Sequence, residues 1–288
     1  MRLSDRLASQ PFGLVLSAGF FGFFGHAGVL ASLEAHGLSP AAYAGTSAGA
    51  LVAAMAASGL GAAEVAERLC SVRKEDFWDP SVGGLLGDVV RGGLTGLLRG
   101  DRFRAKLDST LPAARFEDCA HPLVVVTSDV TRAASRVHDR GPLAPVIHAS
   151  CAYPGLFRAV DDGASQLWDG GLIDKAPIVA LLDRQPALRA ILVVYLPSQT
   201  RARASRAPRR HGYVGGLQQG LAAVRHEHYV LQARLAEARG IPVFELSPDL
   251  PPVGPSRLSQ GPIAIAEARR LCDVALTDDE QRCRSFAR

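Results

Sequence analysis

The chain has 288 residues, of which 48% are hydrophobic and 21% are charged, so it is long enough to bury a sizeable core. Its formal charge of +4 is too small and too dispersed to predict a nucleic-acid partner. The five cysteines are odd in number and include no CxxC pair. This argues against a disulfide framework or a zinc site and favours a reducing compartment. We expect a single α/β domain.

The first long apolar segment, residues 12–33, has about the length of a membrane span and follows two arginines, as the core of a secretory signal would. Its five glycines and His26 would specify a spanning helix poorly. A strand at 13–17, a glycine loop and a helix at 26–37 account for every glycine. We therefore expect a cytoplasmic protein, with peripheral membrane contact left open. A signal or anchor is the alternative.

The pentapeptide GTSAG at 45–49 places Ser47 in a GxSxG frame between a short apolar strand, 41–44, and a small-residue helix, 48–59. A tight strand-to-helix turn needs small flanking residues and pushes the serine hydroxyl out over the sheet. Ser47 is therefore a candidate nucleophile. The alternative is a tightly packed turn without chemistry, because GxSxG is common in chains rich in alanine and glycine.

The remaining pattern alternates strands with helices, which predicts a mainly parallel sheet covered on both faces. Further helices are predicted at 63–72, 102–110, 143–151, 177–183, 215–238 and 261–276. Further strands are predicted at 122–127, 135–138, 166–168, 190–196 and 241–245. Continuous apolar runs at 122–127 and 190–196 are typical of central strands that are buried on both sides.

Two segments break this alternation. Residues 81–100 mix glycines with leucine and valine pairs, which indicates either a mobile lid over an apolar site or a loosely packed helix. Residues 201–210 carry five arginines. We interpret them as an exposed linker, and a patch for anionic headgroups is the alternative.

A serine hydroxyl needs a base within hydrogen-bond reach and donors that hold the negative charge of a tetrahedral intermediate. The segment at 17–25 follows the first strand and opens a helix, so its glycines can turn backbone N–H groups toward one point. This is typical of an oxyanion hole. A dinucleotide loop is the competing interpretation, but the glycine spacing is not GxGxxG.

The candidate base is Asp169, at the end of a short predicted strand and followed by Gly170 and Gly171. Two glycines after a carboxylate let the chain turn sharply and pass close to another element, which holds the acid in a partly desolvated position. An ordinary turn or a calcium ligand is the alternative.

In order and spacing, these three motifs resemble those of the patatin-like phospholipases. That family has a glycine-rich oxyanion loop, a GxSxG elbow close behind it and a later DG(G/A) acid. TSDVT at 127–131 and IHASCAYPGLF at 147–157 extend the resemblance, which covers about residues 13–177. It implies a three-layer α/β/α fold with a mainly parallel central sheet. We expect one domain over 1–288, with a core at about 13–200 and a helix-strand-helix extension at 212–288.

The resemblance implies a catalytic dyad without cofactor or metal. Ser47 would attack an acyl carbonyl, and Asp169 would accept its proton and later activate water. The implied oxyanion donors are the N–H groups of Ala18, Gly19, Phe20 and Gly22. The implied motif-framing glycines are Gly45, Gly49, Gly170 and Gly171. The glycine loop departs from the family's GGGxxG, so its register stays open, and Lys175 stands where asparagine is common.

A Ser-His-Asp esterase of α/β-hydrolase type is the first alternative, since His211, His226 and His228 follow Asp169. The second alternative is a non-catalytic relative that binds lipid or protein. Four phenylalanines in the glycine loop suit a fatty acyl chain, although core packing explains at least two of them. The resemblance implies hydrolysis of phospholipid or lysophospholipid, with transient contact to a membrane surface and no nucleic acid.

Overall fold

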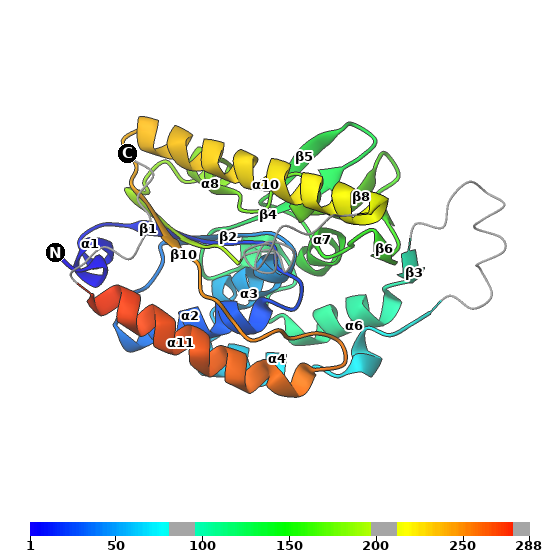
Figure 1. Cartoon of the computed structure of the whole chain (residues 1–288), viewed down its shortest axis with the longest axis horizontal. Helices are drawn as coiled ribbons and strands as arrows, with labels where there is room; N and C mark the ends of the chain where they lie inside the picture. The colour runs from blue at the N-terminus through cyan, green and yellow to red at the C-terminus, as the bar shows by residue number, and fades with distance from the viewer. Residues whose placement is uncertain (81–95, 197–211, 279–288) are drawn as a thin grey trace.

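The computed structural model describes residues 1–80, 96–196 and 212–278. Most of the predicted lid segment, the arginine-rich stretch at 201–210 and His211 therefore lie outside the described residues. The described chain forms three layers, with helices on both faces of a central sheet (Figure 1). This confirms the predicted fold class.

The central sheet has eight strands and is mainly parallel, as predicted. Five parallel strands run in the order β10, β9, β1, β2, β4. Their bounds are β10 Val243–Leu246, β9 Ala190–Val194, β1 Phe12–Leu16, β2 Ala42–Gly45 and β4 Leu123–Asp129. The sheet is completed by β5 Ala134–His138, β7 Val160–Asp161 and β8 Gln166–Asp169, of which β5 and β8 pair antiparallel with β4.

Helices cover the two faces of the sheet unequally. In Figure 1, α10 and α8 lie on one side, and α2, α3, α4 and α11 lie on the other. The bounds are α2 Phe23–Ala35, α3 Ala48–Ala57, α4 Ala62–Cys70, α8 Ile178–Arg184, α10 Tyr213–Ala238 and α11 Gly261–Thr277. Strand β1 joins both layers, because Leu14 and Leu16 pack into one apolar core and Val15 into the other.

A second, two-stranded sheet joins β3 Gly96–Leu98 to β6 Gly155–Phe157. Neither strand was predicted. The end of the 81–100 segment is thus a strand, where the sequence suggested a lid or a loose helix. Three-residue strands carry almost no local signal, and their pairing joins distant parts of the chain.

Three further helices complete the described structure: α1 Leu3–Ala8, α6 Asp101–Thr110 and α7 Leu143–Ser150. The apolar segment at 12–33 forms β1, a loop and most of α2. Within the described ranges, no helix is both long enough and apolar enough to span a bilayer.

Candidate active site

The edge of β4 brings Ser47 and Asp169 together. Gly45, the last residue of β2, pairs with Val125, while Asp169, the last residue of β8, pairs with Thr127. Because β5 occupies the opposite edge of β4 at both positions, β2 and β8 share one edge and approach each other end to end. The turn after β2 therefore projects Ser47 toward the end of β8.

The turn at Ser47 is a strained strand-to-helix elbow. Ser47 has φ 55° and ψ −122°, a conformation that L-residues rarely adopt. The flanking glycines leave no room for a side chain: a Cβ at Gly49 would lie 2.0 Å from the Leu16 carbonyl oxygen, and one at Gly45 would lie 2.5 Å from the Gly49 oxygen. The elbow therefore requires glycine on both sides, as the motif predicted.

The Ser47 hydroxyl donates a 2.7 Å hydrogen bond to Oδ2 of Asp169, across 122 residues of sequence. The other carboxylate oxygen, Oδ1, accepts from the Gly171 N–H at 2.7 Å. The backbone N–H of Asp169 donates to the Ala152 carbonyl at 2.9 Å. Since the side chain is held through both oxygens, its orientation toward Ser47 is well defined.

Burial raises the pKa of the Asp169 carboxyl to about 6. Three influences oppose that rise: the hydrogen bonds from Ser47 and Gly171, and the positive charge of Arg225. A carboxylate with a pKa near neutrality is a better proton acceptor than an ordinary aspartate and is still ionised at pH 7. Burial also raises the pKa of the neighbouring Cys151 thiol, which stays neutral.

The two glycines after Asp169 let the chain pass close to its neighbours. A Cβ at Gly170 would lie 2.1 Å from the Val126 carbonyl oxygen, and one at Gly171 would lie 2.7 Å from the Ala18 Cβ. These contacts join the end of β8 to β4 and to the start of the glycine loop. Any larger residue at either position would push Asp169 away from Ser47.

Two of the four predicted oxyanion donors are already occupied in this structure. The Ala18 N–H donates to the Lys175 carbonyl, and the Gly22 N–H donates to the Gly19 carbonyl, both at 2.8 Å. The N–H groups of Gly19 and Phe20 donate to no acceptor among the described residues. In this structure the N–H groups of Gly19 and Phe20 are therefore the two predicted donors that remain available to an oxyanion.

Ser150, on the last turn of α7, was not singled out from the sequence. Its hydroxyl accepts from the Ser47 backbone N–H at 2.9 Å and donates to the Val126 carbonyl at 2.7 Å. The side chain is fully buried. Ser150 thus joins the strained elbow to β4 through two hydrogen bonds. The only sequence signal for it is its position within the 147–157 motif.

Arg225 of α10 was also missed. Its Nη1 donates to the Gly171 carbonyl at 3.0 Å, and its charge lowers the pKa of Asp169. No sequence signal marks it, since it is one of several arginines on a long helix.

The histidines lie elsewhere. Nε2 of His26 is 2.8 Å from the Ser17 carbonyl oxygen, and burial lowers the pKa of its imidazole to about 4. Nδ1 of His226 is 3.2 Å from the Tyr195 hydroxyl, and Nδ1 of His228 is 3.4 Å from Gln232. Within the described ranges, the Ser47 hydroxyl has Asp169 as its side-chain hydrogen-bond acceptor, and no histidine bonds to it.

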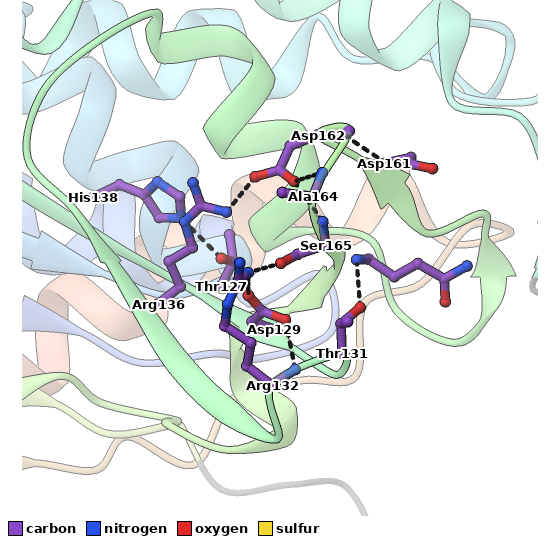
Figure 2. A network of polar contacts seen from close by, with 12 residues as sticks. Thr127, Asp129, Thr131, Arg132, Arg136, His138, Asp161, Asp162, Ala164 and Ser165 are labelled. Atoms are coloured by element: carbon purple, nitrogen blue, oxygen red, sulfur yellow. Dashed lines mark hydrogen bonds and ion pairs between the residues drawn. The ribbon is translucent and has the colours of Figure 1, made fainter.

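A polar network holds β8 in register with β4 and β5 (Figure 2). The buried Asp129 carboxylate accepts from the Arg132 side chain at 2.8 Å, and Arg132 also contacts Ser165 in the turn before β8. The Gln166 N–H donates to the Thr131 hydroxyl at 3.0 Å. If β8 shifted by one residue along β4, the Asp169 side chain would point to the other face of the sheet. By fixing the register, this network keeps the candidate base in position.

Lys175, which follows the Asp-Gly-Gly motif, is also buried. Its ammonium group donates to the Leu196 carbonyl and lies 4.2 Å from the centre of the Tyr195 ring. Its ammonium group therefore takes part in local hydrogen bonding. Among the residues that the structure describes, no group of three or more His, Cys, Asp or Glu side chains is arranged to hold a metal ion.

Several known proteins are similar in sequence to this chain. Lysophospholipase NTE1 of Candida glabrata is 26% identical over 184 residues, 64% of this chain and 10% of that protein. Human patatin-like phospholipase domain-containing protein 6 is 28% identical over 202 residues, 69% of this chain and 14% of that protein. The chain thus spans only a small part of the curated relatives it matches.

Among solved structures, VipD from Legionella pneumophila is similar with a TM-score of 0.46 and 14% identity, over 92% of this chain and 67% of that one. The family model named patatin-like phospholipase matches residues 14–182, more than half of the chain and all of the elements that carry Ser47 and Asp169. On that match, the chain belongs to the patatin-like phospholipase family.

Proposed function

We propose that this protein hydrolyses acyl esters of phospholipid or lysophospholipid through an acyl-enzyme on Ser47, with Asp169 as the general base. The observation that carries the proposal is the 2.7 Å hydrogen bond from a strained, outward-turned serine to a buried carboxylate. Family membership supports the reaction class. The similarity to a lysophospholipase of Candida glabrata supports the substrate class.

In the first half-reaction, the Ser47 oxygen attacks the ester carbonyl while its proton passes to Oδ2 of Asp169. The tetrahedral oxyanion then collapses, the carbon–oxygen bond to the alcohol breaks, and Asp169 returns the proton to the departing alcohol. In the second half-reaction, Asp169 takes a proton from water, the hydroxide attacks the acyl-enzyme, and the proton returns to Ser47 as the fatty acid leaves.

The oxyanion needs donors preorganised beside Ser47. The unused N–H groups of Gly19 and Phe20 are our candidates. Their loop leaves β1 where Gly49 packs against the Leu16 and Ser17 carbonyls, so it begins in contact with the elbow. The N-terminus of α3, which starts at Ala48, adds a positive helix end at the same place.

A fluorophosphonate probe tests the serine directly, because it captures only activated hydroxyls. We expect stoichiometric labelling of the wild-type protein, mapped by peptide mass to Ser47, and no labelling of Ser47→Ala. An unlabelled, well-folded wild-type protein would support a non-catalytic relative. Labelling that survives Asp169→Asn but is lost on replacing His226 or His228 would support the Ser-His-Asp alternative.

The substrate is tested by incubating the pure protein with phosphatidylcholine and lysophosphatidylcholine and identifying the products by mass. We expect free fatty acid from at least one of them, absent with Ser47→Ala. Release only from water-soluble esters would restrict the proposal to a carboxylesterase.

A further inference from the structure

Four exposed apolar side chains surround one small apolar cluster beside the candidate site. They are Phe20, Trp78, Leu97 and Tyr153, which are 53%, 40%, 51% and 37% exposed. Each is the chain neighbour of a residue packed in that cluster: Phe21, Phe77, Leu98 and Ala152. The packed partner in each pair holds the exposed one beside the cluster, and we call these four exposed side chains the apolar patch.

Contacts between rings and between main chains join the four segments. The Phe21 and Phe77 rings lie 5.9 Å apart. Pro80 forms an isolated bridge with Leu98, which in turn pairs with Phe157 in the β3–β6 sheet. The Tyr153 carbonyl accepts from the N–H groups of two β6 residues, at 3.0 and 3.1 Å. The four patch side chains therefore come from separate segments that meet at one cluster.

Two members of the patch, Phe20 and Tyr153, belong to segments that also form the candidate site. Phe20 belongs to the loop whose free N–H groups are the oxyanion candidates, and Tyr153 follows Ala152, whose carbonyl accepts from the Asp169 N–H at 2.9 Å. In Figure 1, β6 lies next to α7 and β8, and β3 extends beyond it, away from the N-terminus. A molecule that covers the patch therefore also covers the approach to the candidate site.

A lipid surface is the occupant that fits both the composition of the patch and the proposed function. Tryptophan, tyrosine and phenylalanine are the side chains that prefer the boundary between lipid headgroups and acyl chains. The Lys74 ammonium lies 4.4 Å from the Trp78 ring centre, so the patch has a cation beside it that anionic headgroup phosphates would attract. A protein bound here would obstruct the site, whereas a lipid layer supplies its substrate.

We propose that the apolar patch inserts into the surface of a phospholipid bilayer, so that an acyl ester reaches Ser47 directly from the lipid layer. This inference rests on the proposed function for its choice of partner. It adds which face of the molecule meets the bilayer and which four side chains enter it.

A matched pair of leucines tests the location. Leu97, in the patch, and Leu231, on the outer side of α10, are 51% and 56% exposed. We expect Leu97→Asp to lower partitioning onto phosphatidylcholine vesicles by about tenfold or more, because a carboxylate resists entry into the acyl region. Leu231→Asp should bind vesicles as the wild type does. Equal loss in both variants, or in neither, would overturn the proposal.

Tryptophan fluorescence tests the same surface in the wild-type protein, without relying on a variant that folds. The chain has two tryptophans, and the other, Trp168, is half-buried in β8. We expect vesicles to shift the emission to the blue and brominated phosphatidylcholine to quench it. Trp78→Phe should abolish both signals while binding persists. Quenching that survives Trp78→Phe, or a wild-type spectrum that vesicles leave unchanged, would contradict insertion.

Hydrolysis of a monomeric ester separates docking from chemistry. Leu97→Asp should cleave p-nitrophenyl butyrate at the wild-type rate and vesicle lipid about tenfold more slowly. Equal rates on vesicle lipid would overturn the docking proposal. If the wild-type protein binds vesicles through the patch but cleaves neither ester, the proposed function is contradicted and the docking proposal is not.

Discussion

The elbow at Ser47 and the glycine loop at 17–22 are neighbouring versions of the same unit. Each follows a parallel strand and opens a helix, and the last residues of the two strands, Leu16 and Gly45, are paired. Each contains a non-glycine residue at positive φ, Ser47 at 55° and Phe21 at 52°. They differ in what keeps that conformation in place.

At the elbow, backbone packs on backbone. The nearest atoms to a Cβ at Gly45 or Gly49 are main-chain atoms, at 2.0 to 2.8 Å. In the loop, side chains fill the space. A Cβ at Gly22 would meet the Leu196 side chain at 2.3 Å, and the Phe21 ring is held by the Phe23 ring at 5.6 Å.

A turn held by its main chain cannot yield to a larger residue, whereas one held by the ends of side chains can adjust. The elbow carries the atom whose position the proposed chemistry depends on most. The loop carries donors for a charge that develops only during reaction. We therefore expect substitutions at the elbow to act on folding or on all turnover, and those in the loop to act more weakly.

The largest effect is expected for Gly49→Ala. The added methyl group would lie 2.0 Å from the Leu16 carbonyl oxygen, and neither backbone can move away. We expect the free energy of unfolding in urea to fall by at least about 4 kcal/mol. The control is Gly220→Ala in α10, where nothing lies within 4 Å and a gain of about 0.5–1 kcal/mol is expected. A Gly49→Ala protein as stable as the wild type would remove the distinction between the two turns.

Asp169→Asn should lower kcat by about a thousandfold or more, because the amide accepts no proton from Ser47. It should also stabilise the fold at pH 8. The pKa of Asp169 is raised to about 6, so its contribution to stability is present below the ordinary aspartate value and lost as pH rises through 6.

Asparagine does not ionise, so the variant does not lose this stability as pH rises. We expect a higher Tm than the wild type at pH 8, corresponding to at most about 3 kcal/mol, and a smaller difference at pH 5. The Tm of both proteins at the two pH values checks this. A lower Tm for the variant at pH 8 would argue against a desolvated carboxylate.

Ser150→Ala removes the acceptor of the Ser47 N–H and should let the elbow relax. We expect kcat to fall about 10- to 100-fold with little change in KM, since a displaced nucleophile binds substrate but reacts poorly. The control is Ser32→Ala, which removes an equally buried hydroxyl hydrogen-bonded to Asp273. If both variants lose stability but only Ser150→Ala loses kcat, Ser150 is a positioning residue. Equal kcat in both would show that its role is structural.

The pH profile should report the ionisation of Asp169. Proton acceptance requires the carboxylate, so kcat/KM should rise with pH and level off above an apparent pKa of about 6. Arg225→Gln removes a charge that lowers this pKa, and the profile should shift to higher pH. A profile that ignores Arg225 would indicate that another group titrates.

The smallest effect is expected for Phe21→Gly in the loop. Glycine adopts a φ of 52° without strain, which offsets part of the lost ring contacts. We expect the free energy of unfolding to fall by about 1–3 kcal/mol, less than for Gly49→Ala, and kcat to fall several-fold. Phe21→Ala, which keeps the strain and loses the ring, should be less stable than Phe21→Gly. A loop variant as damaging as Gly49→Ala would refute the comparison.

Local patterns in the sequence determined the alternating strands and helices, the elbow at Ser47 and the acid motif at Asp169. Each depends on neighbours within a few residues: apolar periodicity, small residues where a turn is tight, and glycines after a carboxylate. The roles of Ser47 and Asp169 in catalysis stay predictions, although the structure brings the two side chains into hydrogen-bond contact.

Only the tertiary structure decided which distant groups support those motifs. Ser150 meets Ser47 across 103 residues, and Arg225 meets Gly171 across 54. Strands β3 and β6 exist only as partners, and the Ala18 and Gly22 N–H groups are hydrogen-bonded because of where Lys175 and Gly19 place their carbonyl groups. Contacts of this kind depend on the packing of whole elements, and packing energy is summed over many residues that no single motif contains.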